Sequence, residues 1–73
     1  MKPDKLIKMA NQIGAFFDAM PDHEQAVAGV VTHLQKNWEP RMRTALQEYV
    51  TRNGDEALMP IVREALRIVQ KAG

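Results

Sequence analysis

Four prolines divide the chain into segments whose apolar residues recur at the spacing of a helix. Pro3, Pro21, Pro40 and Pro60 mark boundaries, because a helix accepts proline in its first turn but not in its interior. No segment alternates apolar and polar residues as a half-buried strand does. The pattern predicts an all-α protein, a small bundle of four short helices. The expected helices span about residues 3–19, 23–37, 40–52 and 60–72.

The residues at the segment ends supply the start and stop signals of helices. Asp22 is a suitable N-cap, and Gln25 follows three residues later in a capping-box arrangement. Pro21 ends the first segment, because the residue before a proline avoids helical backbone geometry. Asn53 and Gly54 form a strong stop, because both tolerate a left-handed backbone. These short connections favour one helical domain over residues 1–73 with mostly antiparallel neighbours.

The last segment carries the broadest apolar arc of the four. The arc is wider than one neighbouring helix can cover, which makes its uncovered part a candidate docking face. Its members are Leu58, Ile61, Val62, Ala65, Leu66, Ile68 and Val69.

The size and composition limit how such a chain can be stabilised. A domain of 73 residues buries only about 60% of its unfolded surface, and its own core supplies about 3–5 kcal/mol. The sequence has no cysteine, which removes disulfides, cysteine–zinc sites and iron–sulfur clusters. A protein partner remains as the expected source of further stability. The net charge of +1 argues against a dedicated nucleic-acid or membrane-surface binder.

The sequence also predicts the compartment. No apolar run approaches the roughly 18 residues of a membrane span, so we expect no membrane partner. The charged N-terminus lacks the continuous apolar region and cleavage site of a signal peptide. We therefore expect a cytoplasmic protein.

Residue types that carry catalysis are scarce and scattered. The chain has no serine, and its nine carboxylates are spread over caps and polar faces. His23 and His33 lie about 15 Å apart along one helix and cannot share a metal ion. Gly14 and Gly29 interrupt helices, and either close approach of another backbone or tolerated imperfection accounts for them. The sequence predicts no catalytic, cofactor-binding or metal-binding residue.

Two stretches combine apolar anchors with polar residues and are predicted to bind a partner. In the first, two adjacent phenylalanines cannot point the same way, so one is available to a partner or lies under the last helix. In the second, we expect Trp38 and Met42 to face mostly inward, while Arg41 and Arg43 point outward. The predicted partner-binding residues are Met9, Asn11, Gln12, Phe16, Phe17, Trp38, Pro40, Arg41, Met42 and Arg43.

The same stretches carry a family resemblance that covers nearly the whole chain. The run from Lys5 to Phe17, then His33-Leu34 and the run from Trp38 to Arg43, resembles the delta subunit of cytoplasmic NAD-dependent formate dehydrogenases. The run from Leu58 to Arg63 is similar too. One departure is Asn37, where the family pattern has an aromatic residue before the tryptophan.

The resemblance implies an accessory role in a large complex that interconverts formate and carbon dioxide with NAD. Larger subunits of that complex would hold a molybdenum or tungsten pterin cofactor, iron–sulfur clusters and flavin mononucleotide. The delta subunit would hold no cofactor and would serve assembly, cofactor maturation or stability. No catalytic residue carries over from the family.

One alternative remains from the residues alone, a small helix-turn-helix-like protein that binds nucleic acid. Short helices and four arginines permit it, although the near-neutral charge and the lack of a concentrated basic helix argue against it. The arginines concerned are Arg41, Arg43, Arg63 and Arg67.

Overall fold

The computed structural model describes residues 2–72, with side chains described for residues 2–70, and this part of the chain forms four helices and no strand. The predicted all-α class is thereby confirmed. The helices are α1 (Pro3–Asp18), α2 (His23–Asn37), α3 (Pro40–Asn53) and α4 (Pro60–Ala72). Their boundaries differ from the expected ones by one residue at the ends of α1 and α3.

The helix ends form for the reasons that the sequence indicates. Asp22 accepts a hydrogen bond from the backbone N–H of Gln25 at 3.3 Å, which satisfies one free donor at the start of α2. Gly54 adopts a φ of 88° after α3, and its N–H donates to the carbonyl of Val50 at 2.8 Å. Prolines occupy the first positions of α1 and α3.

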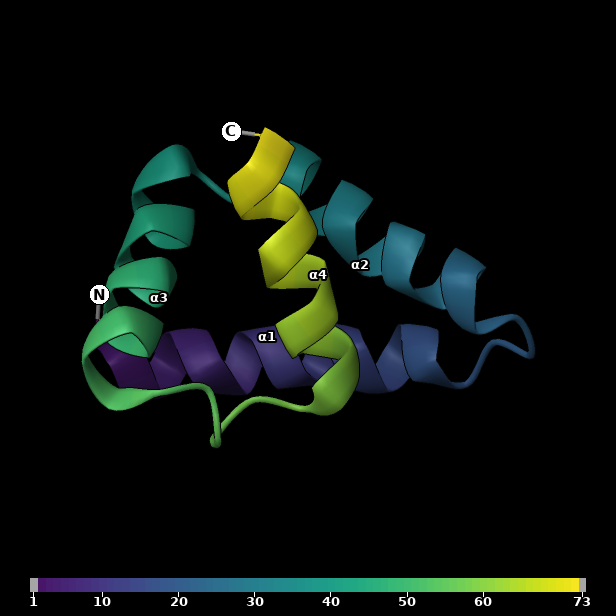
Figure 1. Ribbon diagram of the computed structural model, residues 1–73, viewed down its shortest axis with the longest axis horizontal. Helices are drawn as coiled ribbons and strands as arrows, with labels where there is room; N and C mark the ends of the chain where they lie inside the picture. Colours follow the sequence, from purple (N-terminus) through teal and green to yellow (C-terminus); the bar gives the residue numbers. More distant parts are fainter. Residues whose placement is uncertain (1, 73) are drawn as a thin grey trace.

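The arrangement of the helices differs from a set of antiparallel sequence neighbours. Helix α1 contacts the other three helices and α2 packs most extensively on α4, whereas α2–α3 and α3–α4 contacts are few. Figure 1 shows α3 and α4 crossing α1 steeply instead of lying along it. Trp38 and Glu39 have an extended backbone, which redirects the chain between α2 and α3. Helices α1 and α2 cover most of the broad arc of α4, whereas Ile68 remains exposed.

One hydrophobic core joins all four helices, and among the described residues no buried polar side chain interrupts it. The largest side chains that are fully enclosed come one or two from each helix. They are Leu6, Val30, Leu34, Leu46 and Val62.

The two helical glycines stand where side chains from other helices fill the space. A Cβ at Gly14 would lie 2.6 Å from Cγ2 of Val62 on α4, and one at Gly29 would lie 2.4 Å from the ring of Phe17 on α1. Both glycines are therefore explained by the close approach of another helix. The groups that approach them are side chains and not backbone atoms.

Candidate functional site

The adjacent phenylalanines of α1 divide between the core and the surface. Phe17 turns toward α2 and packs over Gly29, whereas Phe16 is 74% exposed. Their rings still meet edge to face, with centroids 5.1 Å apart. Phe17 packs on α2, so the exposed Phe16 is the member available to a partner.

Phe16 borders a hollow of about 360 Å³ between α1 and the end of α2, which we name the Phe16 groove. The hollow combines residues from both stretches singled out in the sequence, so the fold joins positions about twenty residues apart into one surface. Its lining consists of Met9, Gln12, Ile13, Phe16, Phe17, His33 and Trp38.

The remaining predicted positions around Trp38 lie at the turn into α3. Trp38 is 5% exposed and Met42 packs half-buried against the core, as expected for both. Pro40 and Arg41 are exposed in the first turn of α3. Trp38 thus supplies the floor of the Phe16 groove, whereas Pro40, Arg41 and Met42 are not part of its lining.

Arg43 does not point outward as predicted. Its Nη1 donates to the carbonyls of Leu34, Gln35 and Trp38 at 3.1, 3.2 and 2.9 Å, which satisfies acceptors left free at the end of α2. The side chain turns back because these carbonyls lie within its reach and lack helical donors. Its motif position therefore reflects folding at this corner.

Asn11 also makes intramolecular contacts that its helical spacing does not reveal. Its Nδ2 donates to the carbonyl of Ala57 and its Oδ1 accepts from the N–H of Met59, each at 2.9 Å. The side chain holds the connection before α4, and no short-range sequence signal marks this partner 46 or 48 residues away.

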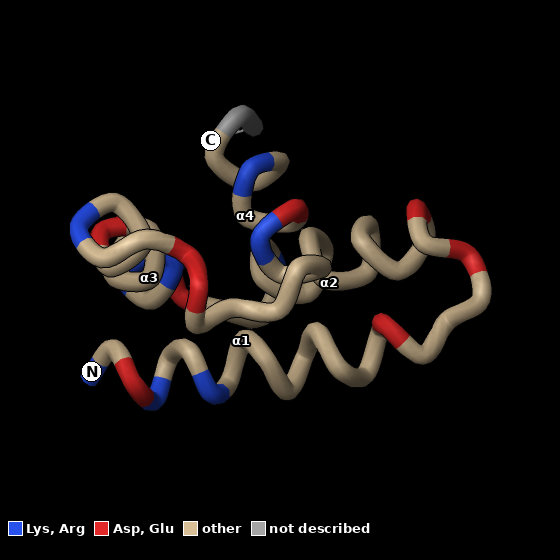
Figure 2. The backbone as a smooth tube through the Cα atoms, turned by 60° about the horizontal axis from the view of Figure 1, so that its bottom comes forward, with Lys and Arg blue, Asp and Glu red and all other residues tan. Residues whose placement is uncertain are grey.

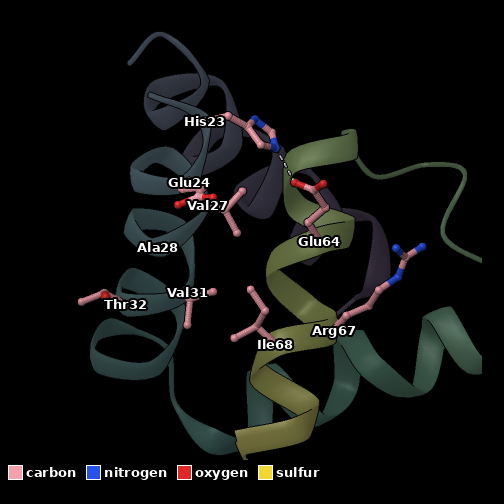
Figure 3. Close-up of a pocket in the computed structure, with 9 residues that line it drawn as sticks. All are labelled: His23, Glu24, Val27, Ala28, Val31, Thr32, Glu64, Arg67 and Ile68. Atoms are coloured by element: carbon pink, nitrogen blue, oxygen red, sulfur yellow. Dashed lines mark hydrogen bonds and ion pairs between the residues drawn. The ribbon is translucent and has the colours of Figure 1, made fainter. Parts of the chain in front are cut away.

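A second hollow lies between α2 and α4, with a volume of about 570 Å³ (Figure 3). Val27 and Val31 of α2 and Ile68 of α4 point into it, and Ile68 remains 46% exposed. At one end Nε2 of His23 and Oε2 of Glu64 approach to 2.6 Å. We name this hollow the α2–α4 groove. The sequence indicated it through the broad apolar arc of the last helical segment.

A shallower hollow links the two grooves across the exposed side of α2. It shares Phe17 and His33 with the Phe16 groove, and Ala28 and Thr32 with the α2–α4 groove. The three hollows therefore form one continuous, largely apolar band around α2, suited to contact with another protein.

The described His and carboxylate side chains lie apart or contact neighbours within the chain. Over the described residues, no group of three or more His, Cys, Asp or Glu side chains could hold a metal ion. His33 instead contacts Asn37, with 3.3 Å between Nδ1 and Nδ2.

Two of the four arginines considered for nucleic-acid binding are engaged within the chain. Arg43 bonds to the end of α2, as described above, and Arg63 donates to the carbonyls of Asp55, Glu56 and Leu58 at 2.9 to 3.2 Å. These bonds reduce the basic surface that a nucleic acid could contact. Among the residues that the structure describes, no helix is long and apolar enough to cross a membrane.

Comparison with known proteins gives one family. Residues 5–66 match the family model described as "NADH-dependant formate dehydrogenase delta subunit FdsD". No curated protein and no solved structure matches the chain. The matched residues include the whole Phe16 groove and end before Arg67 and Ile68 of the α2–α4 groove. Because the match spans most of the chain, the protein belongs to the delta-subunit family of NADH-dependent formate dehydrogenases.

Proposed function

We propose that this protein is a non-catalytic accessory subunit of a cytoplasmic NAD-dependent formate dehydrogenase complex. It binds a larger subunit through the Phe16 groove and thereby supports assembly, cofactor maturation or stability of the complex. The observation that carries the proposal is an exposed aromatic side chain beside an apolar hollow, both within the residues matched to the family.

The physical chemistry of this surface supports docking. A phenylalanine that is 74% exposed leaves apolar area in water, and burying such a side chain stabilises a complex by about 1.5–3 kcal/mol. Trp38 beneath the groove is held in the core, so the surface is formed before a partner arrives. A preformed surface loses little conformational entropy on binding.

The proposal assigns all cofactors to larger subunits. A molybdenum or tungsten pterin cofactor, iron–sulfur clusters and flavin mononucleotide would lie there, and this chain would bind none of them. The absence of cysteine supports this division, because thiolates are the usual ligands of iron–sulfur clusters.

The first test is Phe16→Asp, co-expressed with the tagged largest subunit. Placing a charge beside the groove removes the apolar anchor, so we expect the chain to be lost from the purified complex. Ala15→Asp is the matched control, because it adds the same charge at the neighbouring exposed position outside the groove. Circular dichroism of both variants checks that the helices persist.

Co-purification of the two variants with the largest subunit tests the docking surface. Loss of co-purification with Phe16→Asp but not with Ala15→Asp supports docking at the Phe16 groove. Undiminished co-purification with Phe16→Asp contradicts the proposed site. A wild-type chain that never co-purifies with a formate dehydrogenase subunit contradicts the proposed function.

A second experiment separates assembly from a permanent structural role. Native mass spectrometry of the complex, purified from cells that make the pterin cofactor and from cells that do not, measures the occupancy of this chain in each. Occupancy only in the cofactor-free form indicates maturation. Equal occupancy in both forms indicates a lasting structural subunit.

A further inference from the structure

The charges around the α2–α4 groove are unevenly distributed. No lysine or arginine occurs from residue 9 to residue 35, whereas Asp18, Asp22 and Glu24 fall within that stretch. Figure 2 shows acidic segments and no basic ones where α1 connects to α2. Glu64 of α4 joins this end through its contact with His23. The end of the groove at Glu24 and Glu64 is therefore acidic, whereas Arg67 lines the groove farther along α4.

The floor of the groove is apolar and its length suits a helix. Glu24 and Thr32 both belong to the lining on α2, and their separation of eight positions corresponds to about 12 Å, or about two helical turns. Val27, Val31 and Ile68 point into this space (Figure 3). A helix with apolar residues at positions i, i+3 or i+4, and i+7 would fill such a floor.

We propose that the α2–α4 groove receives an amphipathic helix from a larger subunit, with a lysine or arginine placed against Glu24 and Glu64. The inference rests on the proposed function for the source of that helix, and it adds a second contact beyond the Phe16 groove. Apolar residues of the incoming helix contact Val31 and Ile68, and its basic side chain neutralises the acidic end.

A larger subunit fits this surface better than a second copy of the chain. A stable protein–protein interface buries about 800 Å² of accessible surface on each partner. A groove that is only two helical turns long offers less than this. The Phe16 groove is continuous with it through the hollow that Ala28 and Thr32 share. One extended partner surface can cover the whole band, whereas a copy seated in the α2–α4 groove alone leaves Phe16 uncovered.

Charge and apolar variants of the complete complex test the contact. Glu24→Lys is expected to weaken binding to the purified larger subunits about tenfold, because it opposes the incoming basic residue. Ile68→Asp is expected to weaken it at least as much, by placing a charge on the apolar floor. Glu48→Lys is the matched control, since Glu48 is exposed on α3 and lines neither groove. Both effects are measured as dissociation constants.

Site-specific crosslinking identifies what lies in the groove. Because the chain has no cysteine, Thr32→Cys provides one thiol at the edge of the groove for a benzophenone–maleimide crosslinker. Irradiation of the complex followed by mass spectrometry is expected to give a peptide of a larger subunit with an amphipathic helical pattern and a basic residue.

The outcomes separate this inference from the proposed function. Normal binding by both Glu24→Lys and Ile68→Asp, with Phe16→Asp still disruptive, overturns the α2–α4 contact and leaves the proposed function standing. A crosslink to a second copy of this chain also overturns the contact. Loss of binding by Glu24→Lys and Ile68→Asp, with the expected crosslink and an unaffected Glu48→Lys, supports it.

Discussion

At the scale of single residues, polar side chains complete the backbone hydrogen bonding of helix ends. Arg43 contacts three carbonyls at the end of α2, and Arg63 contacts three carbonyls in the connection before α4. Arg43 satisfies acceptors that α2 leaves free at its C-terminal end, whereas Arg63 bonds to carbonyls of the connection itself. Neither residue is thus a free cation of the surface.

Substitution of these arginines should separate folding from docking. Arg43→Ala removes three charge-assisted hydrogen bonds and is expected to lower the free energy of unfolding by about 1–3 kcal/mol. Arg41→Ala, at an exposed position two residues earlier, is the control and should change it by about 0.5 kcal/mol or less. Urea denaturation followed by circular dichroism measures both, and equal effects would contradict the role assigned to Arg43.

Arg41 also provides the clean test of a charged docking contact. Arg41→Glu leaves the fold unperturbed, because the side chain is exposed, so a loss of co-purification with the larger subunit reports on binding. If co-purification is undiminished, Arg41 has no part in the interface.

Gly14 gives a second prediction at the residue scale. Gly14→Ala gains helix propensity, yet its Cβ would lie 2.6 Å from a methyl of the fully buried Val62. Because Val62 is enclosed and stiff, we expect a net loss of about 1–3 kcal/mol in the free energy of unfolding. The double variant with Val62→Ala should lose less than the sum of the two single variants. Additive losses in thermal unfolding would show that the two residues do not collide.

At the scale of elements, the connection between α3 and α4 is held from both sides. Asn11 of α1 bonds to Ala57 and Met59, and Arg63 of α4 bonds to the carbonyls of residues 55, 56 and 58. These hydrogen bonds fix the direction in which α4 leaves the connection. They thereby position the broad apolar arc of α4 against α1 and α2.

Removing the contact from α1 should loosen this connection locally. Asn11→Ala deletes both hydrogen bonds, so the amide of Met59 is expected to exchange about ten times faster or more with deuterium, equivalent to about 1.4 kcal/mol of local stability. Gln12→Ala, at the exposed neighbouring position, should leave that exchange rate unchanged. Unaltered exchange in Asn11→Ala would show that Arg63 alone holds the connection.

At the scale of the whole molecule, a small core stands beside uncovered apolar surface. The isolated chain is expected to have a free energy of unfolding of about 3–5 kcal/mol, and its melting temperature should rise with the logarithm of the partner concentration above the dissociation constant. Differential scanning calorimetry, with and without the larger subunit, measures both. A sharp transition at high temperature for the dilute isolated chain would contradict dependence on a partner.

Local patterns in the sequence determine where the helices of this protein begin and end. Proline positions, caps and helical periodicity predict the four helices to within one residue, because these signals act over a few neighbouring positions. The sequence likewise marks Met9, Phe16 and Trp38, which line one groove. The interface role of all the predicted residues stays a prediction.

Only the tertiary structure decided which helices meet and which polar residues turn inward. The crossing of α3 and α4 over α1, the bonds from Asn11 to residues 57 and 59, and the return of Arg43 to α2 each join distant positions. Such contacts depend on how helices pack in three dimensions, which helical periodicity does not encode. The continuity of the two grooves around α2 arises in the same way, since each groove needs walls from helices that only folding brings together.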